Sequence, residues 1–466
     1  MGTRRDFLKI LGAGAALALG ACGRKGEKGA DPSDAEASGR EGMTFRTNPT
    51  TGDKVSLLGF GCMRLPTVSG GSGRDGDAAI DQEAVNAQVD YALAHGVNYF
   101  DTSPVYCKGR SEHAMGIALS RHPRDSYFIA TKLSNQSPEK WSREASMAIY
   151  ENSFRELRTD VIDYMLLHAV GMGEKGGMET LKGRYLDNGM LDFLLEERAK
   201  GKLRNLGFSY HGDIRVFDHL LERQDKGELK WDFVQIQLNY VDWRHAKEVN
   251  ARNTNAEYLY GELSRRGIPA VIMEPLLGGR LASLNFRAIE LLKRLDPMAS
   301  IASWAFRFAG TREGVMTVLS GMTYMEHLKE NIRTFSPLKP LGKAELDALE
   351  EAALTILDFP LVPCNTCQYC MPCPYGLDIP AIFSHYNKCL NEGRYADSVT
   401  DDNYREARRA FLVGYDRAVP KLRQADRCVG CGECVGHCPQ RIDIPDQMRR
   451  IDRYAEMLKT TFPREG

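Results

Sequence analysis

An acid, a phenol, an ammonium and an imidazole follow three successive strand-like segments of the sequence. Asp101 and Tyr106 follow the apolar run NYF. Lys132 ends the run FIATK, and His168 ends the run DYMLLH. An ammonium beside a phenol favours the phenolate and lowers its pKa from about 10, so this set can move a proton near neutral pH.

Two runs of four cysteines near the C-terminus have the spacing of iron-sulfur ligands. CVGCGECVGHCP follows C-x2-C-x2-C-x3-C-P, whereas CNTCQYCMPCP has one residue fewer before its last cysteine, which leaves its ligand assignment open. In two-cluster proteins the fourth cysteine of each run binds the other cluster. We predict two 4Fe-4S clusters, with zinc or disulfides as the alternatives. The eight predicted ligands are Cys364, Cys367, Cys370, Cys373, Cys428, Cys431, Cys434 and Cys438.

The segments that must position the first four residues indicate repeated strand-helix units. Strands are expected near residues 57–62, 98–101, 127–133, 161–168, 204–209, 233–239, 269–274 and 315–320. An open doubly wound sheet would have a G-x-G-x-x-G turn after its first strand, but the sequence there is LLGFGCMRLP. We therefore predict an α/β fold with a (β/α)8 TIM barrel, whose chemistry lies at the C-terminal ends of its strands.

The D-x4-Y spacing and the strand-end lysine and histidine resemble the aldo-keto reductase family over residues 44–338. The resemblance implies a catalytic tetrad: Asp101, Tyr106, Lys132 and His168. Tyr106 would donate a proton as hydride transfer places negative charge on a carbonyl oxygen. Lys132 would lower the pKa of that phenol, and Asp101 would keep the ammonium charged and oriented. His168 would donate a hydrogen bond to the substrate oxygen.

The same resemblance implies a nicotinamide cofactor, NAD(P)(H). Ser209 and Gln237 match positions that hold the nicotinamide amide in the family. Glu330 and Asn331 match a pair that holds adenine. These four residues are therefore the predicted cofactor contacts.

Positions that select NADPH depart from the family pattern. Gly321, Met322 and His327 stand where lysine, serine and arginine would clamp a 2′-phosphate, and Met273 stands where a tyrosine usually stacks under the nicotinamide. A phosphate site without fixed cations lacks its strongest charge-assisted hydrogen bonds. The sequence therefore does not predict a preference for NADPH.

Residues 339–466 are expected to form a mostly helical, ferredoxin-like iron-sulfur domain, because residues 379–390 and 403–413 between the cysteine runs have helical character. The order of barrel and cysteine-rich tail resembles the aldo-keto reductase subgroup with a C-terminal ferredoxin-type domain. Nicotinamide transfers two electrons as hydride, each cluster transfers one, and no flavin motif is found in the sequence.

The N-terminus has the features of a targeting signal. TRRDFLK resembles a twin-arginine export signal, and LGAC resembles a lipobox that ends at Cys22. We predict a twin-arginine lipoprotein signal peptide over residues 1–22 and a flexible linker over residues 23–43. The protein is then expected to be exported to the periplasm or cell surface and anchored to the membrane by a lipid at Cys22.

The charge balance gives no reason to expect a nucleic-acid partner, because 61 Lys and Arg residues are matched by 62 Asp and Glu residues, for a net charge of −1.

The expected partners are a small carbonyl or alcohol substrate and a redox partner protein. Our leading hypothesis is an exported oxidoreductase that interconverts a carbonyl and an alcohol and is coupled to the two clusters. The alternative is a non-catalytic electron-transfer or docking subunit in which the barrel is a scaffold.

Overall fold

The computed structural model describes six parts of the chain, which are residues 42–73, 78–173, 176–358, 361–438, 440 and 442–461. The predicted signal peptide, Cys22 and nearly all of the predicted linker lie outside them. None of the helices in these described parts combines the length and the apolar character needed to cross a membrane.

Eight parallel strands close into a barrel in the order β10-β3-β4-β5-β6-β7-β8-β9. The strands are β3 (Leu58–Gly61), β4 (Tyr99–Asp101), β5 (Phe128–Leu133), β6 (Ile162–Val170), β7 (Leu203–Tyr210), β8 (Phe233–Gln237), β9 (Ala270–Met273) and β10 (Val315–Gly321). A short antiparallel pair, β1 (Phe45–Thr47) and β2 (Lys54–Ser56), precedes them. Each barrel strand coincides with an expected one, so the predicted fold is confirmed.

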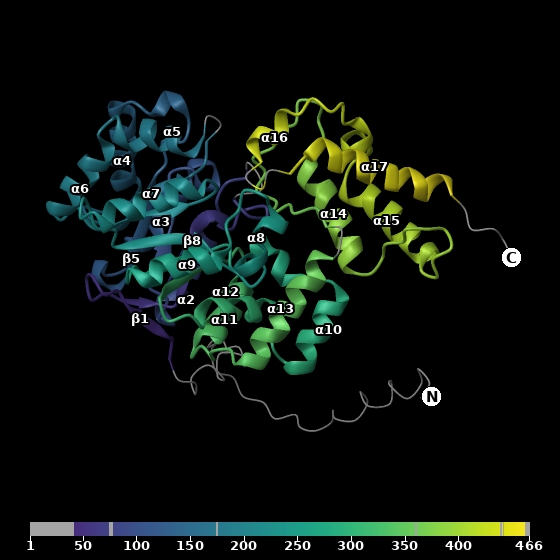
Figure 1. Ribbon diagram of the computed structural model, residues 1–466, viewed down its shortest axis with the longest axis horizontal. Coiled ribbons are helices and arrows are strands. Elements are labelled where there is room, and N and C mark those ends of the chain that lie inside the picture. The colour runs from purple at the N-terminus through teal and green to yellow at the C-terminus, as the bar shows by residue number, and fades with distance from the viewer. Residues whose placement is uncertain are drawn as a thin grey trace, which may run out of the picture. The chain divides into compact units, whose positions relative to one another are not determined.

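Helices follow the strands and cover the barrel (Figure 1). They are α2 (Gln82–Ala94), α3 (Ser111–Leu119), α4 (Arg143–Leu157), α5 (Gly177–Leu181), α6 (Met190–Ala199), α7 (Ile214–Asp225), α8 (Asp242–Val249), α9 (Ala256–Arg265), α10 (Phe286–Leu295), α11 (Ile301–Gly310) and α12 (Met325–Phe335). Several begin at a side chain that caps the first turn; Ser142, for example, accepts a hydrogen bond from the Ala145 amide. Such caps fix the residue at which a helix begins, and so they also fix the end of the loop before it.

Helix α13 (Lys343–Leu357) packs against α10, and its apolar face belongs to the barrel core. Leu349, Ala352 and Ala353 are fully buried there. By packing, this helix therefore belongs with the barrel, although the sequence boundary placed it after residue 338.

The predicted helical C-terminal region is also confirmed, and it has a hydrophobic core of its own. Its helices are α14 (Ile379–Asn391), α15 (Tyr404–Ala418), α16 (Glu433–His437) and α17 (Ile444–Thr460). The sequence Asp-Ile-Pro begins both α14 and α17, where Asp378 and Asp443 cap the first turn and proline occupies an early position that needs no amide donor.

Candidate active site and cysteine centres

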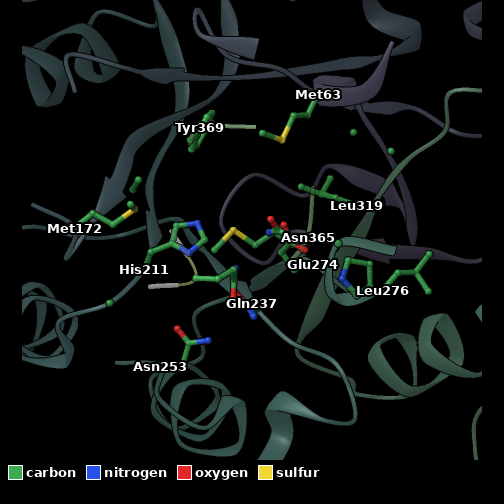
Figure 2. Close-up of a pocket in the computed structure, with 18 of the residues that line it drawn as sticks. Met63, Met172, His211, Gln237, Asn253, Glu274, Leu276, Leu319, Asn365 and Tyr369 are labelled. Atoms are coloured by element: carbon green, nitrogen blue, oxygen red, sulfur yellow. The ribbon is translucent and has the colours of Figure 1, made fainter. Parts of the chain in front are cut away.

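A cavity of about 2000 Å³ opens at the C-terminal ends of the barrel strands. Asp101, Tyr106 and His168 line it, and Figure 2 shows His211 and Gln237 among the side chains at its wall. The cavity continues to Glu330 and Asn331 on α12. It is therefore large enough to hold an extended ligand together with a small substrate.

Lys132 lies at the centre of the predicted tetrad. Its Nζ donates hydrogen bonds to Asp101 Oδ1 at 2.6 Å and to the Thr102 carbonyl oxygen at 2.8 Å. Gln235 donates to the other Asp101 oxygen at 3.1 Å. Burial raises the pKa of Asp101, although Lys132 and Gln235 act in the opposite direction. A buried ammonium fixed by these two hydrogen bonds has little freedom, so its charge has a fixed place in the site.

Tyr106 lies next to this ammonium. Lys132 Nζ is 4.6 Å from the centroid of the Tyr106 ring. The centroids of the Tyr106 and His168 rings are 6.1 Å apart, and the two ring planes make an angle of 81°. The two residues that follow, Cys107 and Lys108, have φ angles of 50° and 56°, a left-handed conformation that is costly for residues with a Cβ. This turn directs the tyrosine back toward the strand ends.

The surroundings of His168 favour its neutral imidazole form. Burial lowers its pKa well below the ordinary value, and the positive charges of Lys132 and Arg184 lower it further. The Ser134 hydroxyl lies 2.6 Å from its Nδ1 and fixes the ring. The structure thus brings all four predicted catalytic residues together, while their roles stay predictions.

Glu112 is a buried acid next to the tetrad that the sequence did not single out. Its carboxyl group accepts a hydrogen bond from Thr131 at 2.6 Å, and Thr131 precedes Lys132 in β5. Burial raises the pKa of Glu112 to about 7. Glu112 can therefore bind a proton, and it contacts the residue that precedes Lys132. No sequence pattern indicates this role.

Glu112 predicts a pH dependence of stability. The folded protein holds this proton more tightly than the unfolded chain, so the free energy of unfolding falls as the pH rises from about 4.5 to about 7. Glu112→Gln should remove that contribution, which amounts to roughly 3 kcal/mol over the range. The free energy of unfolding of wild type and variant, measured at a pH below and a pH above this range, tests the prediction. Glu151→Gln, a substitution of an exposed glutamate, is the control. An unchanged pH dependence in Glu112→Gln would contradict the assignment.

Three of the four predicted cofactor residues line the cavity: Gln237, Glu330 and Asn331. The Gln237 amide donates to Asp242 at 2.5 Å, and the Asn331 amide donates to Ser320 at 3.0 Å. Ser209 does not line the cavity; its hydroxyl is buried behind the wall and accepts a hydrogen bond from the Ala169 amide at 2.8 Å. Ser209 therefore supports the backbone beside His168.

Arg64 is a cation that the sequence did not associate with the cofactor groove. It follows β3, lines the cavity and packs against Gly321, where an added Cβ would lie 3.1 Å from Arg64 Cδ. Met322 is buried, so it does not face the groove. The aliphatic stem of Arg64 thus packs on Gly321, while its Nη2 donates a hydrogen bond to the Asn365 carbonyl oxygen at 3.4 Å.

The cysteines form two groups, and each group combines three residues of one run with one residue of the other. The first group lines one small apolar cavity: Cys364, Cys367, Cys370 and Cys438. Burial raises the pKa of Cys370 to about 12, and the other three thiols of the group raise it further. Ile379, Phe383 and Ile444 complete the wall. Four thiols around an apolar space are the donor set of a 4Fe-4S cluster.

The second group is indicated by the electrostatics of Cys434. Burial raises the pKa of this thiol to about 11, and Cys431, Cys428 and Cys373 raise it further. Nowhere in the described ranges do three His, Cys, Asp or Glu side chains stand close enough to hold a single metal ion. A 4Fe-4S cluster takes one thiolate at each of its irons, so its ligands stand farther apart than those of one ion.

Comparisons with known proteins agree with this division of the chain. Residues 57–353 match the model of the Aldo/keto reductase family, and residues 363–442 match that of a 4Fe-4S dicluster domain. L-galactose dehydrogenase of Arabidopsis thaliana is 25% identical over 64% of this chain and 90% of its own length. An NADH-specific methylglyoxal reductase of Escherichia coli is 24% identical over 61% of this chain and 90% of its own.

A solved structure shows the same barrel. The holo form of an aldo-keto reductase from Bacillus halodurans superposes with a TM-score of 0.51 at 22% sequence identity, covering 66% of this chain and 96% of its own. These relatives and this structure cover 61–66% of the chain, whereas residues 363–442 match the dicluster domain.

Proposed function

We propose that this chain, which belongs to the aldo/keto reductase family and is an oxidoreductase, interconverts a carbonyl and an alcohol in the barrel cavity. The observation that carries the proposal is the buried ammonium of Lys132, which contacts both Asp101 and the Tyr106 ring beside the cavity. An ammonium in this place stabilises a phenolate, so Tyr106 becomes a better proton donor to a neighbouring oxygen.

In this mechanism each side chain of the tetrad has one task. Lys132 places its positive charge beside Tyr106, and Asp101 holds Lys132 in place at 2.6 Å. Tyr106 gives its proton to the substrate oxygen as negative charge develops there. His168, neutral and fixed by Ser134, donates a hydrogen bond to the same oxygen.

We further propose that a nicotinamide cofactor binds along the cavity and supplies the hydride. Gln237 would contact its amide end, and Glu330 and Asn331 its adenine end, since all three line one continuous space. Arg64, whose Nη2 donates to the Asn365 carbonyl oxygen, lines the same cavity. NADH is the cofactor named for the Escherichia coli relative, which supports a nicotinamide here without deciding between NADH and NADPH.

We propose two 4Fe-4S clusters in the dicluster domain, one held by each cysteine group, with a redox partner protein as electron donor or acceptor. Export by the twin-arginine route and a lipid at Cys22 belong to the same proposal, supported by the residues TRRDFLK and LGAC. Because that route moves folded proteins, clusters assembled in the cytoplasm would survive export.

The position of Arg280 leads us to expect that the two proposed clusters differ in reduction potential. It lies in the turn Leu277–Ala282 after β9, and its Nε and Nη1 are buried with no hydrogen-bond partner in the described residues. Burial raises the pKa of Cys364 to about 11, and the charge of Arg280 opposes that rise. Reduction adds negative charge to the cluster that Cys364 would hold, so Arg280 should favour the reduced state.

Arg280→Gln should therefore lower the reduction potential of that cluster alone, as measured by a redox titration followed by electron paramagnetic resonance. Arg453→Gln, an exposed change on α17 with the same loss of charge, should leave both potentials unchanged. Two unchanged potentials in Arg280→Gln would contradict the assignment.

The proposed function is tested with protein purified with its clusters intact. Binding of NADH and NADPH is titrated first, and oxidation of the bound nicotinamide is then followed with a panel of aldehydes and ketones. Turnover of at least one carbonyl supports the proposal. Absence of nicotinamide binding together with absence of carbonyl turnover would contradict it and favour the scaffold alternative.

A further inference from the structure

Arg184 is a buried arginine in the wall of the cavity, and no carboxylate among the described residues pairs with it. Only 3% of its surface is exposed, and it lines the same cavity as Tyr106 and His168. Across the described residues it forms no ion pair, and its Nη2 has no hydrogen-bond partner. An uncompensated buried charge costs several kcal/mol, which points to a missing counterion.

Neutral groups hold this guanidinium in place. Arg184 Nε donates to Asn135 Oδ1 at 3.2 Å, and the guanidinium lies 4.8 Å from the centroid of the Tyr185 ring. The Arg184 backbone oxygen accepts hydrogen bonds from Asn135 and Asn188 at 2.9 Å. These contacts hold the residue in place, and none of them is with an acidic group.

Trp141 supplies a second free donor on the same wall. Its Nε1 is buried without a hydrogen-bond partner in the described residues, and the residue lines the cavity. Its ring packs on Gly183, the neighbour of Arg184, where an added Cβ would lie 2.5 Å from the ring. Asn188 also donates to the Trp141 backbone oxygen at 2.7 Å and so ties the two residues together.

These two donors lie on the His168 side of the cavity. Asn135, which holds Arg184, directly follows Ser134, whose hydroxyl contacts His168 Nδ1. Arg184 stands in a π-helix, Lys182–Leu186, a local irregularity that is common at functional sites. Among the described residues, Arg184 Nη2 and Trp141 Nε1 thus have no acceptor, and both residues line the cavity that His168 lines.

We propose that Arg184 and Trp141 bind a carboxylate of the substrate, so that the substrate is an oxo acid. Two directed donors suit the two oxygens of a carboxylate, whereas a phosphate dianion would need further cations. This inference rests on the proposed carbonyl chemistry, but the anion site itself is defined by Arg184 and Trp141 alone.

The experiment compares matched acidic and neutral carbonyl compounds. Binding of phenylglyoxylate and of 4-carboxybenzaldehyde is measured by calorimetry against their methyl esters, on the full protein with its clusters. The wild type should prefer at least one acid over its ester by about tenfold or more. Arg184→Gln should abolish that preference and leave the ester affinities within about twofold.

Arg215→Gln is the matched control. Arg215 lines the same cavity, but Asp213 already pairs with it at 2.7 Å, so its loss should leave the acid preference unchanged. Trp141→Phe keeps the ring and removes the donor, and it should weaken acid binding selectively. This variant decides the outcome if Arg184→Gln does not fold.

The results separate the two proposals. Equal affinity of the wild type for both acids and their esters, or an acid preference that survives both substitutions, would overturn the carboxylate site. Selective acid binding that depends on Arg184, without turnover of any carbonyl, would leave the site standing and contradict the proposed function instead.

Discussion

Tyr106→Phe is expected to reduce carbonyl turnover by about a hundred- to ten-thousandfold, the range attributed to one positioned proton donor. The substitution removes only the hydroxyl group, so the contact between the ring and Lys132 at 4.6 Å should persist. Substrate affinity should therefore change little, and the loss should appear in kcat. Steady-state kinetics on any carbonyl that the wild type reduces provides the measurement.

Two comparisons make this result specific to proton transfer. Tyr258 also lines the cavity, but its hydroxyl donates to Asp218 at 2.9 Å, so Tyr258→Phe should retain turnover. The absorbance of the iron-sulfur clusters should be identical in both variants. A Tyr106→Phe protein with full activity on every substrate would remove Tyr106 from the mechanism.

Cys438→Ala is expected to remove the cluster associated with the first cysteine run, although Cys438 belongs to the second run. The reason is that Cys438 lines the same small cavity as Cys364, Cys367 and Cys370. About half of the iron should be lost, together with one of two paramagnetic signals, if each group holds one cluster. Iron analysis and electron paramagnetic resonance of the purified variant provide the measurement.

Arg280 identifies which cluster is lost. In Cys438→Ala the remaining cluster should have a potential that does not respond to Arg280→Gln, whereas in Cys373→Ala the remaining cluster should respond. Cys389→Ala, which removes a buried cysteine outside both runs, should keep all of the iron. The reverse dependence on Arg280 would show that each run holds its own cluster.

The barrel and the proximity of the tetrad could be predicted from the sequence because both follow from local pattern. Each strand is a short apolar run, and parallel strands that close into a barrel bring their C-terminal ends to one face. Asp101, Lys132 and His168 stand at such ends, so their meeting required only that the barrel form. The starts of α14 and α17 also follow a local pattern, since each has a capping aspartate before Ile-Pro.

Other features depend on which side chains face one another across the fold, and no local pattern records that. Arg64 packs on Gly321, and the charge of Arg280 acts on Cys364, although in each pair the two residues are far apart in the sequence. The uncompensated charge of Arg184 could be recognised only when all of its neighbours were known.

By itself, then, the sequence determined the elements and the residue types at their ends, since apolar periodicity and capping act between near neighbours. Tertiary structure alone decided that Ser209 lies behind the cavity wall, whereas the place of Cys438 in the first cysteine group follows the rule for two-cluster sequences. Burial and charge compensation are sums over every group that surrounds a side chain, and those groups come together only when the chain folds.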